Sequence, residues 1–360
     1  MSPGRFPPKG WGSVRGEFPI SLLCGLDNPV GSGWQHKSTV GVYTLTEPYL
    51  TYRRNLTTLT AIGLLKFYGV ISRPFGYRWL AWVGVFAGKF LDRKEPCVAR
   101  LSQDAKFKFF LADYYWNKLV CRGFRYEPEI ETVLSAVRDI DYLFLDLGAN
   151  YGYWSILASS RSFQGKQAIA VEPVRRNHHM LRENNRINRN RFTPVRAAVA
   201  RQAGETVRIH THPGSLANEG ASLSLHSILP ESESESVATT SIDQLAGKYA
   251  KAGQPIVIKL DVEGMEVEAV QGAEEVLKRD VLLIYEDHGN DPACRISDHL
   301  LGLGMSVSHL EFGTLCPVYS LEDVRSIKTR ANKGYNLFAY RGGSVFDLAT
   351  RMKSTAIKEK

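Results

Sequence analysis

Between residues 141 and 303, short apolar runs alternate along the chain with segments of helical periodicity. The runs predict strands at 142–148, 167–173, 194–200, 256–262 and 281–287, and two later runs predict strands at 306–312 and 336–341. The segments between them predict helices at 152–160, 175–188, 241–250, 265–278 and 293–303. Most runs are apolar at nearly every position, as in strands buried on both faces of a parallel sheet. The alternation predicts an α/β protein with a doubly wound sheet.

The chain before residue 141 has a different pattern. Residues 1–40 hold seven Gly and five Pro without periodicity, and we expect them to be disordered. Residues 41–100 are rich in Leu and aromatic residues with scattered Lys and Arg, which predicts helical or interfacial segments rather than part of a sheet. We expect lead-in helices at 101–140, the main domain at 141–345 and a tail at 346–360.

The formal net charge of the chain is +8, and this charge is unevenly distributed. The first 100 residues contain 13 Lys and Arg against 5 Asp and Glu, whereas residues 101–360 contain 32 of each. The basic character thus belongs to the N-terminal region, and we predict no nucleic-acid partner for the main domain. The five Cys include no CxxC pair, and the N-terminus has no apolar signal-like run. These features predict a cytoplasmic protein without a disulfide framework.

Four aromatic residues in the N-terminal region would share one face of a helix, because they recur every three or four positions: Trp79, Trp82, Phe86 and Phe90. Four basic residues lie close to them in the sequence: Arg78, Lys89, Arg93 and Lys94. Two interpretations remain open. The region can pack on the main domain as a helical subdomain. Alternatively, it can contact a membrane peripherally and place the site near a lipid-linked or envelope-glycan acceptor.

The segment FLDLGANYGYWS (144–155) reads as a strand, a glycine turn and the start of a helix. Gly148 and Gly152 allow a tight turn and a close approach to a ligand, and the helix N-terminus offers unpaired N–H groups. A dinucleotide-binding turn has a glycine where this chain has Asn150, so the turn fits a ligand without a pyrophosphate. Glu172 ends the second strand, where a carboxylate can bind both ribose hydroxyls of NAD or S-adenosylmethionine.

Charged residues also follow two later buried strands. IVIKLDVEG (256–264) carries Lys259, Asp261 and Glu263, and LLIYEDHG (282–289) ends in a second group, Glu286, Asp287 and His288. Charged groups at the exit of an apolar strand are costly unless they are paired or used in function. Because two neighbouring parallel strands present their carboxyl ends at one edge, we expect a shared site there. Structural ion pairs and helix capping are the alternative.

These segments, together with AVEP, RENNRIN and TTSIDQL, make residues 141–290 resemble the FkbM-type methyltransferases. The resemblance implies a Rossmann-like sheet of seven strands in the order 3-2-1-4-5-7-6, with the last strand antiparallel. It also implies S-adenosylmethionine as the cofactor and methylation of a hydroxyl group, often on a sugar or another natural product.

The resemblance also implies roles for single residues. Those that would line the methionine and ribose part of the cofactor are Asp146, Gly148, Asn150 and Gly152. Glu172 would bind the ribose hydroxyls, and Asn188 with residues 196–198 would lie near the adenine. Residues 218–225 (NEGASLSL) resemble the family's loop of small residues that covers the active site.

Methyl transfer is an in-line displacement at the sulfonium carbon, in which the enzyme aligns the acceptor oxygen and removes its proton. The predicted catalytic residues are Lys259 and three candidate bases: Asp261, Glu263 and His288. The ordinary pKa of His288 suits a base best. We predict no metal, although Asp261 and Asp287 could together bind Mg²⁺.

Three other functions are less consistent with these residues. A methyltransferase that acts on nitrogen in nucleic acid would usually have an NPPY-like turn after the fourth strand, where this chain has LDVEG. An NAD-dependent oxidoreductase would need the missing middle glycine. A non-catalytic binding module would not need the intact Gly148, Gly152 and Glu172. The sequence therefore predicts an O-directed methyltransferase.

Overall fold

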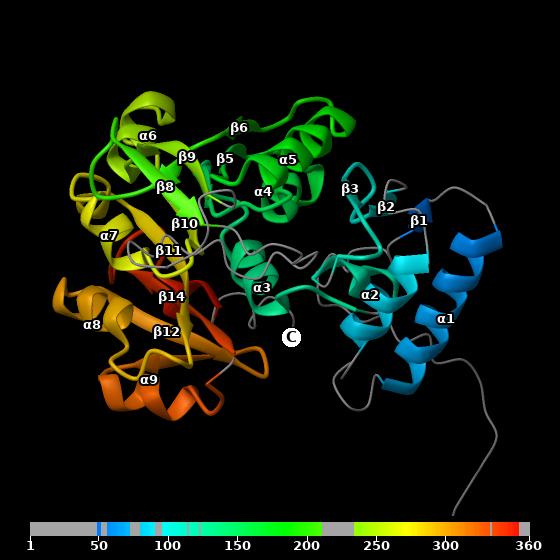
Figure 1. Ribbon diagram of the computed structural model, residues 1–360. Helices are drawn as coiled ribbons and strands as arrows, with labels where there is room; N and C mark the ends of the chain where they lie inside the picture. The colour runs from blue at the N-terminus through cyan, green and yellow to red at the C-terminus, as the bar shows by residue number, and fades with distance from the viewer. Residues whose placement is uncertain are drawn as a thin grey trace, which may run out of the picture. The chain divides into compact units, whose positions relative to one another are not determined.

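The computed structural model describes residues 49–51, 56–72, 80–90, 96–113, 115–121, 124–210, 234–331 and 333–352 (Figure 1). Several features discussed above lie outside the described residues. These are the predicted disordered segment 1–40, Arg78, Trp79, Arg93, Lys94, the loop 218–225 and most of the tail.

An eight-stranded sheet, in the order β13-β12-β14-β11-β10-β4-β5-β6, forms the centre of the main domain (Figure 1). Its strands are β4 (Leu143–Leu147), β5 (Gln167–Val171), β6 (Thr193–Val195), β10 (Ile256–Leu260), β11 (Val281–His288), β12 (Ser306–Glu311), β13 (Thr314–Val318) and β14 (Gly334–Tyr340). β4 pairs in parallel with both β5 and β10, and β14 runs antiparallel to β11. Without β13, the strands numbered along the chain have the predicted order 3-2-1-4-5-7-6.

The predicted sheet lacked β13, which forms an antiparallel hairpin with β12 at the sheet edge. Its sequence, TLCPV, contains Pro317, which has no backbone N–H to donate. An edge strand tolerates this proline because one side of the strand has no partner. A short run with a proline carries little strand signal, so the sequence pattern missed it.

The run at 194–200 does not form the single strand that was predicted. It is divided into β6 and β7 (Ala198–Val199), and β7 belongs to a separate sheet with β8 (Thr206–His210) and β9 (Ser234–Thr240). Arg196 lies between the two strands, and its guanidinium donates to Glu235 at 2.7 Å. Ala198, in β7, packs in a small cluster with Ile209 and Val237. These contacts with the second sheet explain why the strand is interrupted.

In the described part of the chain, β4 is followed by α4 (Tyr153–Ala158), α5 (Arg175–Ile187), α6 (Ile242–Tyr249), α7 (Glu266–Gln271), α8 (Arg295–Gly302) and α9 (Leu321–Ile327). Residues 348–352 are also helical. α7 ends earlier than the predicted 265–278. At Gly272 the chain passes so close to a neighbouring segment that a Cβ atom would lie 2.7 Å from the carbonyl oxygen of Ala200. A 3-10 turn, η5 (Val276–Lys278), follows.

Both faces of the sheet are buried, as the continuous apolar runs predicted. In β4, Phe144 belongs to one hydrophobic cluster, whereas Leu143 and Leu145 belong to the other. Alternate residues of a strand point to opposite faces, so each strand contributes to both clusters. The carboxyl ends of β4, β5, β10 and β11 are thereby held at one edge of a rigid layer.

The N-terminal part contains strands as well as helices. β1 (Tyr49–Thr51), β2 (Cys97–Arg100) and β3 (Lys106–Phe109) form a small antiparallel sheet beside α1 (Leu56–Ser72) and α2 (Leu80–Phe90). The prediction of helices alone over 41–140 was therefore wrong. In β3, KFKF alternates exposed or half-buried lysines with buried Phe107 and Phe109, which is a strand pattern.

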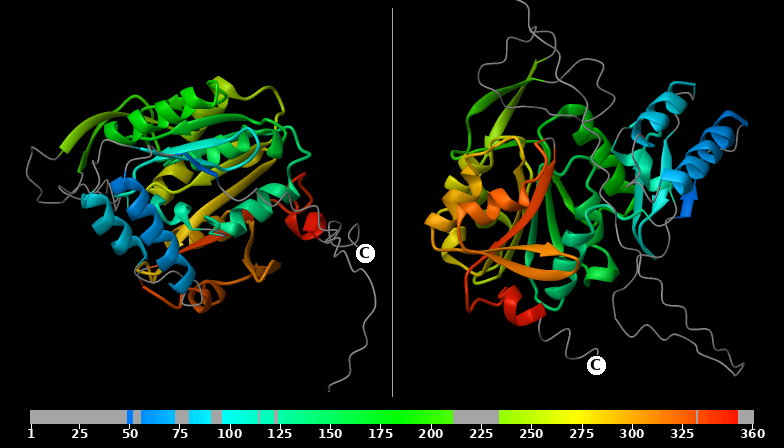
Figure 2. Two further views of the ribbon diagram at one scale, coloured as in Figure 1. Left: turned by 90° about the vertical axis from the view of Figure 1, so that its right-hand side faces the viewer. Right: turned by 90° about the horizontal axis from the view of Figure 1, so that it is seen from below.

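The helices α1 and α2 lie side by side (Figure 2) and contact η2 (Trp116–Val120), a 3-10 turn that precedes α3 (Pro128–Ala136). In the part of the chain that the structure describes, no helix has both the length and the apolar character needed to cross a bilayer.

Candidate active site

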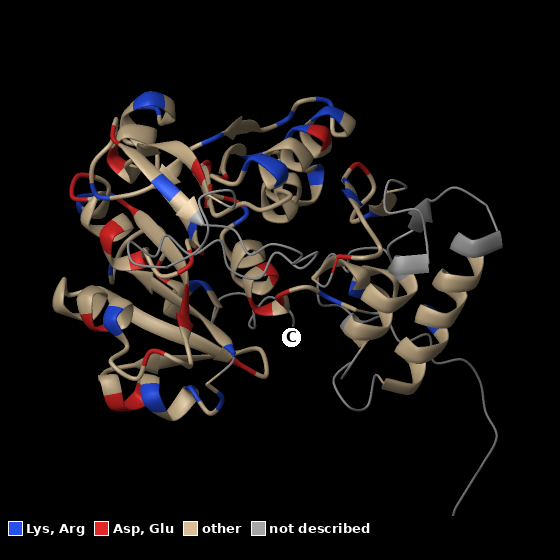
Figure 3. Cartoon of the chain, viewed as in Figure 1, with Lys and Arg blue, Asp and Glu red and all other residues tan. Residues whose placement is uncertain are grey.

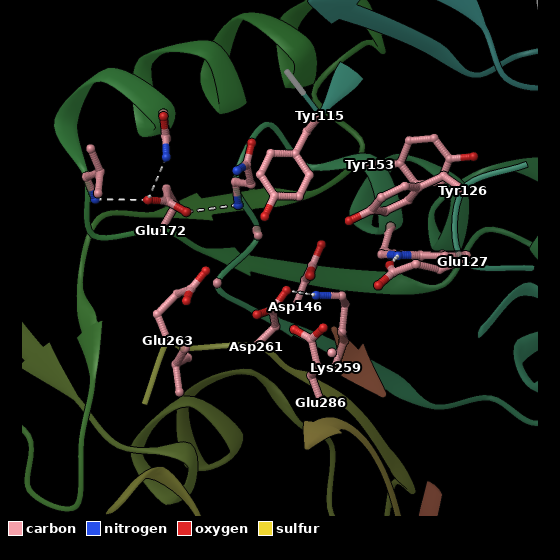
Figure 4. Close-up of a pocket in the computed structure, with 18 of the residues that line it drawn as sticks. Tyr115, Tyr126, Glu127, Asp146, Tyr153, Glu172, Lys259, Asp261, Glu263 and Glu286 are labelled. Atoms are coloured by element: carbon pink, nitrogen blue, oxygen red, sulfur yellow. Dashed lines mark hydrogen bonds and ion pairs between the residues drawn. The ribbon is translucent and has the colours of Figure 1, made fainter. Parts of the chain in front are cut away.

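A cavity of about 450 Å³ opens at the carboxyl ends of β4, β5, β10 and β11 (Figure 4). All four elements predicted to form the site contribute to its lining. Glu172 and Glu127 lie at opposite ends of the cavity in Figure 4, with Asp146 and Asp261 between them. Five aromatic side chains also line the cavity: Tyr115, Trp116, Tyr126, Tyr153 and Trp154. In Figure 4, Tyr126 and Tyr153 lie close to Glu127.

At the glycine turn, segment 144–155 lies in direct contact with segment 256–264. Gly148 has φ 78°, and a Cβ atom there would lie 1.7 Å from the carbonyl oxygen of Asp261. Gly152 has φ 87° at the N-cap of α4, where a Cβ atom would lie 2.5 Å from Leu181 Cδ1. Both positions therefore require glycine, for backbone conformation and for space.

Glu172 fastens this turn from the end of β5. One carboxylate oxygen accepts from the backbone N–H of Asn150 at 2.9 Å, and the other accepts from Val174 N–H at 3.0 Å. Glu172 is buried, and burial raises its pKa to about 7 although these hydrogen bonds act in the opposite direction. Oε1 also accepts from Asn177 Nδ2 at 3.4 Å, whereas Oε2 keeps a second lone pair that a ligand hydroxyl can use.

A buried lysine lies beneath the centre of the cavity. Lys259 Nζ lies 2.9 Å from Asp261 Oδ2, and its side chain is 6% exposed. Burial alone would lower the pKa of Lys259, but the carboxylates of Asp261 and Glu127 outweigh it and keep the pKa above its usual range. The lysine is thus a permanent cation that neutralises part of this acidic site. Its predicted catalytic role stays a prediction.

Asp146 is the penultimate residue of β4 and orients the helix that follows. Its carboxylate accepts from the backbone N–H of Ser155 at 3.0 Å and from the Ser155 hydroxyl at 2.7 Å. Burial raises the pKa of Asp146, and the Lys259 charge lowers it. Asp146 lines the cavity but is only 1% exposed, so it acts on a ligand mainly through the turn that it fixes.

The surroundings of His288 raise its pKa, which weighs against its predicted role as a base. Its Nε2 lies 3.4 Å from Glu286 Oε2, and this interaction raises the pKa of His288 to about 9 despite its partial burial. For Glu263, the shift favours that role. Burial, together with the neighbouring Asp261 charge, raises the pKa of Glu263 to about 7. Near neutral pH, Glu263 is therefore better suited than His288 to accept a proton.

Glu127 is a site residue that the sequence did not reveal. It lies before α3 in the left-handed region (φ 45°), and its carboxylate accepts from Trp154 Nε1 at 2.8 Å and from Asn336 Nδ2 at 3.3 Å. Burial raises its pKa to about 7. In the sequence, Glu127 followed by Pro128 signals only the start of a helix. No motif connects it with strands that begin 16 residues later or beyond.

Asn188 is not among the residues that line the cavity, so the geometry gives no support to its predicted place near the adenine, which stays a prediction. Its side chain accepts from Lys106 N–H at 2.9 Å and donates to the Lys106 carbonyl at 2.6 Å, which fastens β3 to the end of α5. Residues 196–198 do not line the cavity either, although the next residue, Val199, does.

Replacing Asn188 with alanine should therefore lower the free energy of unfolding by about 1–3 kcal/mol, because two buried backbone groups of β3 would lose their partner. The Kd for the cofactor should change by less than about twofold. Urea denaturation and calorimetric titration measure the two effects. A variant that is as stable as the wild type but binds the cofactor much more weakly would show that Asn188 contributes to the cofactor site.

Asp287 lies on the other side of β11 from the cavity, because successive residues of a strand point to opposite faces. Its buried carboxylate pairs with Lys328 and accepts from the Ser297 hydroxyl. It therefore cannot share a Mg²⁺ ion with Asp261. Among the described residues, the one group of side chains arranged as possible metal ligands is on the β12–β13 hairpin: His309, Glu311 and Cys316.

Comparison with known proteins agrees with this architecture. Residues 146–306 match the family model described as Methyltransferase FkbM domain. A curated relative, the hexuronic acid methyltransferase AglP of Haloferax volcanii, is 26% identical over 213 residues, covering 59% of this chain and 81% of the relative.

Two similar solved structures are also methyltransferases. Methyltransferase FkbM from Methylobacillus flagellatus KT has a TM-score of 0.31 and 15% identity, and the match covers 79% of this chain and 59% of that protein. Precorrin-6y C5,15-methyltransferase from Geobacter metallireducens GS-15 has a TM-score of 0.34 and 14% identity, with 58% and 86% covered.

The fold and the match together define a methyltransferase. The match of residues 146–306 to the FkbM methyltransferase model confirms the resemblance seen in the sequence. This family implies S-adenosylmethionine as the cofactor, as predicted.

Proposed function

We propose that the protein transfers the methyl group of S-adenosylmethionine to a hydroxyl group of a sugar or a related natural product. The main support is the pair of charged residues at the ends of β10 and β11, Glu263 with a pKa of about 7 and His288 with a pKa of about 9. A hydroxyl is a poor nucleophile and gains from a base, whereas many other methyl acceptors do not need one. The name of the curated relative, a hexuronic acid methyltransferase, supports a sugar acceptor.

The cofactor would span the cavity from Glu172 toward β10. The second lone pair of Glu172 Oε2 would accept a ribose hydroxyl, while the turn around Asn150 would approach the methionine part. The sulfonium cation would then lie among the carboxylates of the cavity lining, and Asp261 and Glu263 would face the acceptor. This arrangement needs no group besides those of the chain and the cofactor.

In the proposed reaction, Glu263 accepts the hydroxyl proton as the acceptor oxygen bonds to the methyl carbon and the bond from sulfur breaks. His288, held by Glu286, would orient the acceptor as a hydrogen-bond donor. Glu127 is a second carboxyl with a pKa of about 7 and would face the positive cofactor at the other end. Its carboxylate is better placed to stabilise that cation than to receive the acceptor proton.

Replacing Glu172 with glutamine should raise the Kd for S-adenosylmethionine by about 10- to 150-fold, since hydrogen bonds to a charged group contribute about 1.5–3 kcal/mol. Calorimetric titration measures the change, and thermal unfolding shows whether the turn is intact. The matched control is Glu275→Gln, which changes an exposed carboxylate beyond the C-terminal end of α7. Equal affinities in both variants would remove Glu172 from the ribose site.

The acceptor class is tested by incubating the protein with labelled methyl donor and a panel of saccharides that includes uronic acids. The proposal expects label in a saccharide ether, which mild alkali does not release. Label that alkali releases as methanol would show a carboxyl acceptor instead. Label found only in nucleic acid or protein would contradict a sugar acceptor.

A further inference from the structure

Large apolar side chains are exposed on the two N-terminal helices, and we propose that they form a surface that docks on an anionic membrane. This surface, the α1–α2 face, consists of Leu59, Leu64, Phe67, Val70, Ile71, Trp82 and Phe86. These are seven of the eleven large apolar side chains that are exposed in the described part of the chain, so they are concentrated rather than scattered. A membrane contact through one aromatic face was one of the two interpretations that the sequence left open, and the structure places most of the surface on α1.

The helix α1 has large apolar residues on both its buried and its exposed sides, and Lys66 is its one charged residue. Ala61, Ile62 and Leu65 are buried on one side. With 100° between successive residues, Phe67 and Val70 fall on the opposite side, where they are 67% and 72% exposed. A helix that is apolar all round belongs in a protein interior or against lipid, because water solvates it poorly. On α2, Trp82 and Phe86 are one turn apart and are both 64% exposed.

The charge of these helices favours an anionic bilayer as the partner. Their sequences contain two lysines and no aspartate or glutamate, and Figure 3 shows both helices almost without charged positions. The first 100 residues carry 13 basic and 5 acidic residues, so this region is attracted to anionic headgroups. Since α1 has only 17 residues, it would lie in the interface with its apolar face among the acyl chains rather than cross the bilayer.

The same helices support one wall of the active site. A Cβ atom at Gly69 of α1 would lie 2.4 Å from Cys121 Sγ, and one at Gly84 of α2 would lie 2.2 Å from Asn117 Nδ2, so both helices pack tightly on η2. From η2, the Trp116 indole lines the cavity and donates to Asn150 Oδ1 at 3.3 Å. Membrane docking would thus place the cavity wall near the headgroups. If the proposed function holds, the acceptor would be a saccharide attached to a lipid.

The test is co-sedimentation of the full-length protein with phosphatidylcholine vesicles that either contain phosphatidylglycerol or lack it, at low and high salt. The double variant Phe67→Ser with Val70→Ser removes apolar area from the face without touching the buried side of α1. Phe312→Ser is the matched control, because Phe312 is 99% exposed at the β12–β13 turn. Truncation is unsuitable, because it would uncover η2.

Wild type and Phe312→Ser should pellet with anionic vesicles at low salt and less at high salt. The double variant should bind at least about tenfold more weakly, with unchanged thermal unfolding. Wild type in the supernatant, or equal binding by all three proteins, would overturn the proposal. So would a shift from oligomer to monomer in the double variant without any vesicle binding, since the face would then be a contact between copies of the chain. No methyl donor or acceptor is present, so the result does not depend on the proposed reaction.

Discussion

Replacing Glu263 with glutamine should lower kcat by about 10²–10⁴-fold, which is the usual contribution of a general base. The change keeps the shape of the side chain but removes its ability to take the proton of the acceptor. Because the glutamate pKa is about 7 in the free protein, kcat/KM of the wild type should rise as pH increases from about 6 to 8, where the carboxylate becomes deprotonated. This rise should disappear in the variant. Steady-state kinetics across this pH range, with cofactor Kd from calorimetry, separate catalysis from binding.

Glu266→Gln is the control for Glu263, since Glu266 begins α7 on the same segment but does not line the main cavity. It should retain turnover within about threefold. Full activity in the Glu263 variant would show that the base lies elsewhere. If the activity of a slow Glu263 variant still rises with pH near 7, Glu127 becomes the next candidate base, because its pKa is also about 7.

Replacing Lys328 with methionine should lower the free energy of unfolding by about 3–5 kcal/mol, because it leaves the buried Asp287 carboxylate without its cation. The two side chains are 3% and 0% exposed, so water cannot replace the lost partner. The comparison is Lys278→Met, which breaks the exposed pair with Glu275 and should cost less than about 1 kcal/mol. Urea denaturation measures both changes.

A third variant, in which Lys328→Met is combined with Asp287→Asn, should regain part of the lost stability because the uncompensated charge is gone. If Lys328→Met and Lys278→Met are equally stable, the buried pair contributes no more than a surface pair. Activity should be largely retained in every variant that remains folded, since Asp287 faces away from the cavity.

The parts of the fold that were predictable depend on local sequence. The apolar runs located the strands of the main sheet. The turn after β4 was recognised from its glycines, and Gly148 has the positive φ that only glycine adopts readily. Contacts between distant segments were not predictable. The role of Glu127 depends on where α3 packs, and the pKa of His288 depends on the position of Glu286. The alternation of side chains along β11 would have excluded Asp287 from the site, and that signal was present in the sequence.

The carboxylates that line the cavity also affect how the proposed reaction ends. Before transfer, the cofactor carries a sulfonium cation that Asp261 and its neighbours attract. After transfer, the sulfur is a neutral thioether, and this attraction is lost while the hydrogen bonds to the ribose remain. In the proposed reaction, the spent cofactor would therefore lose an attraction that the fresh one has, so an acidic cavity would favour exchange of product for substrate.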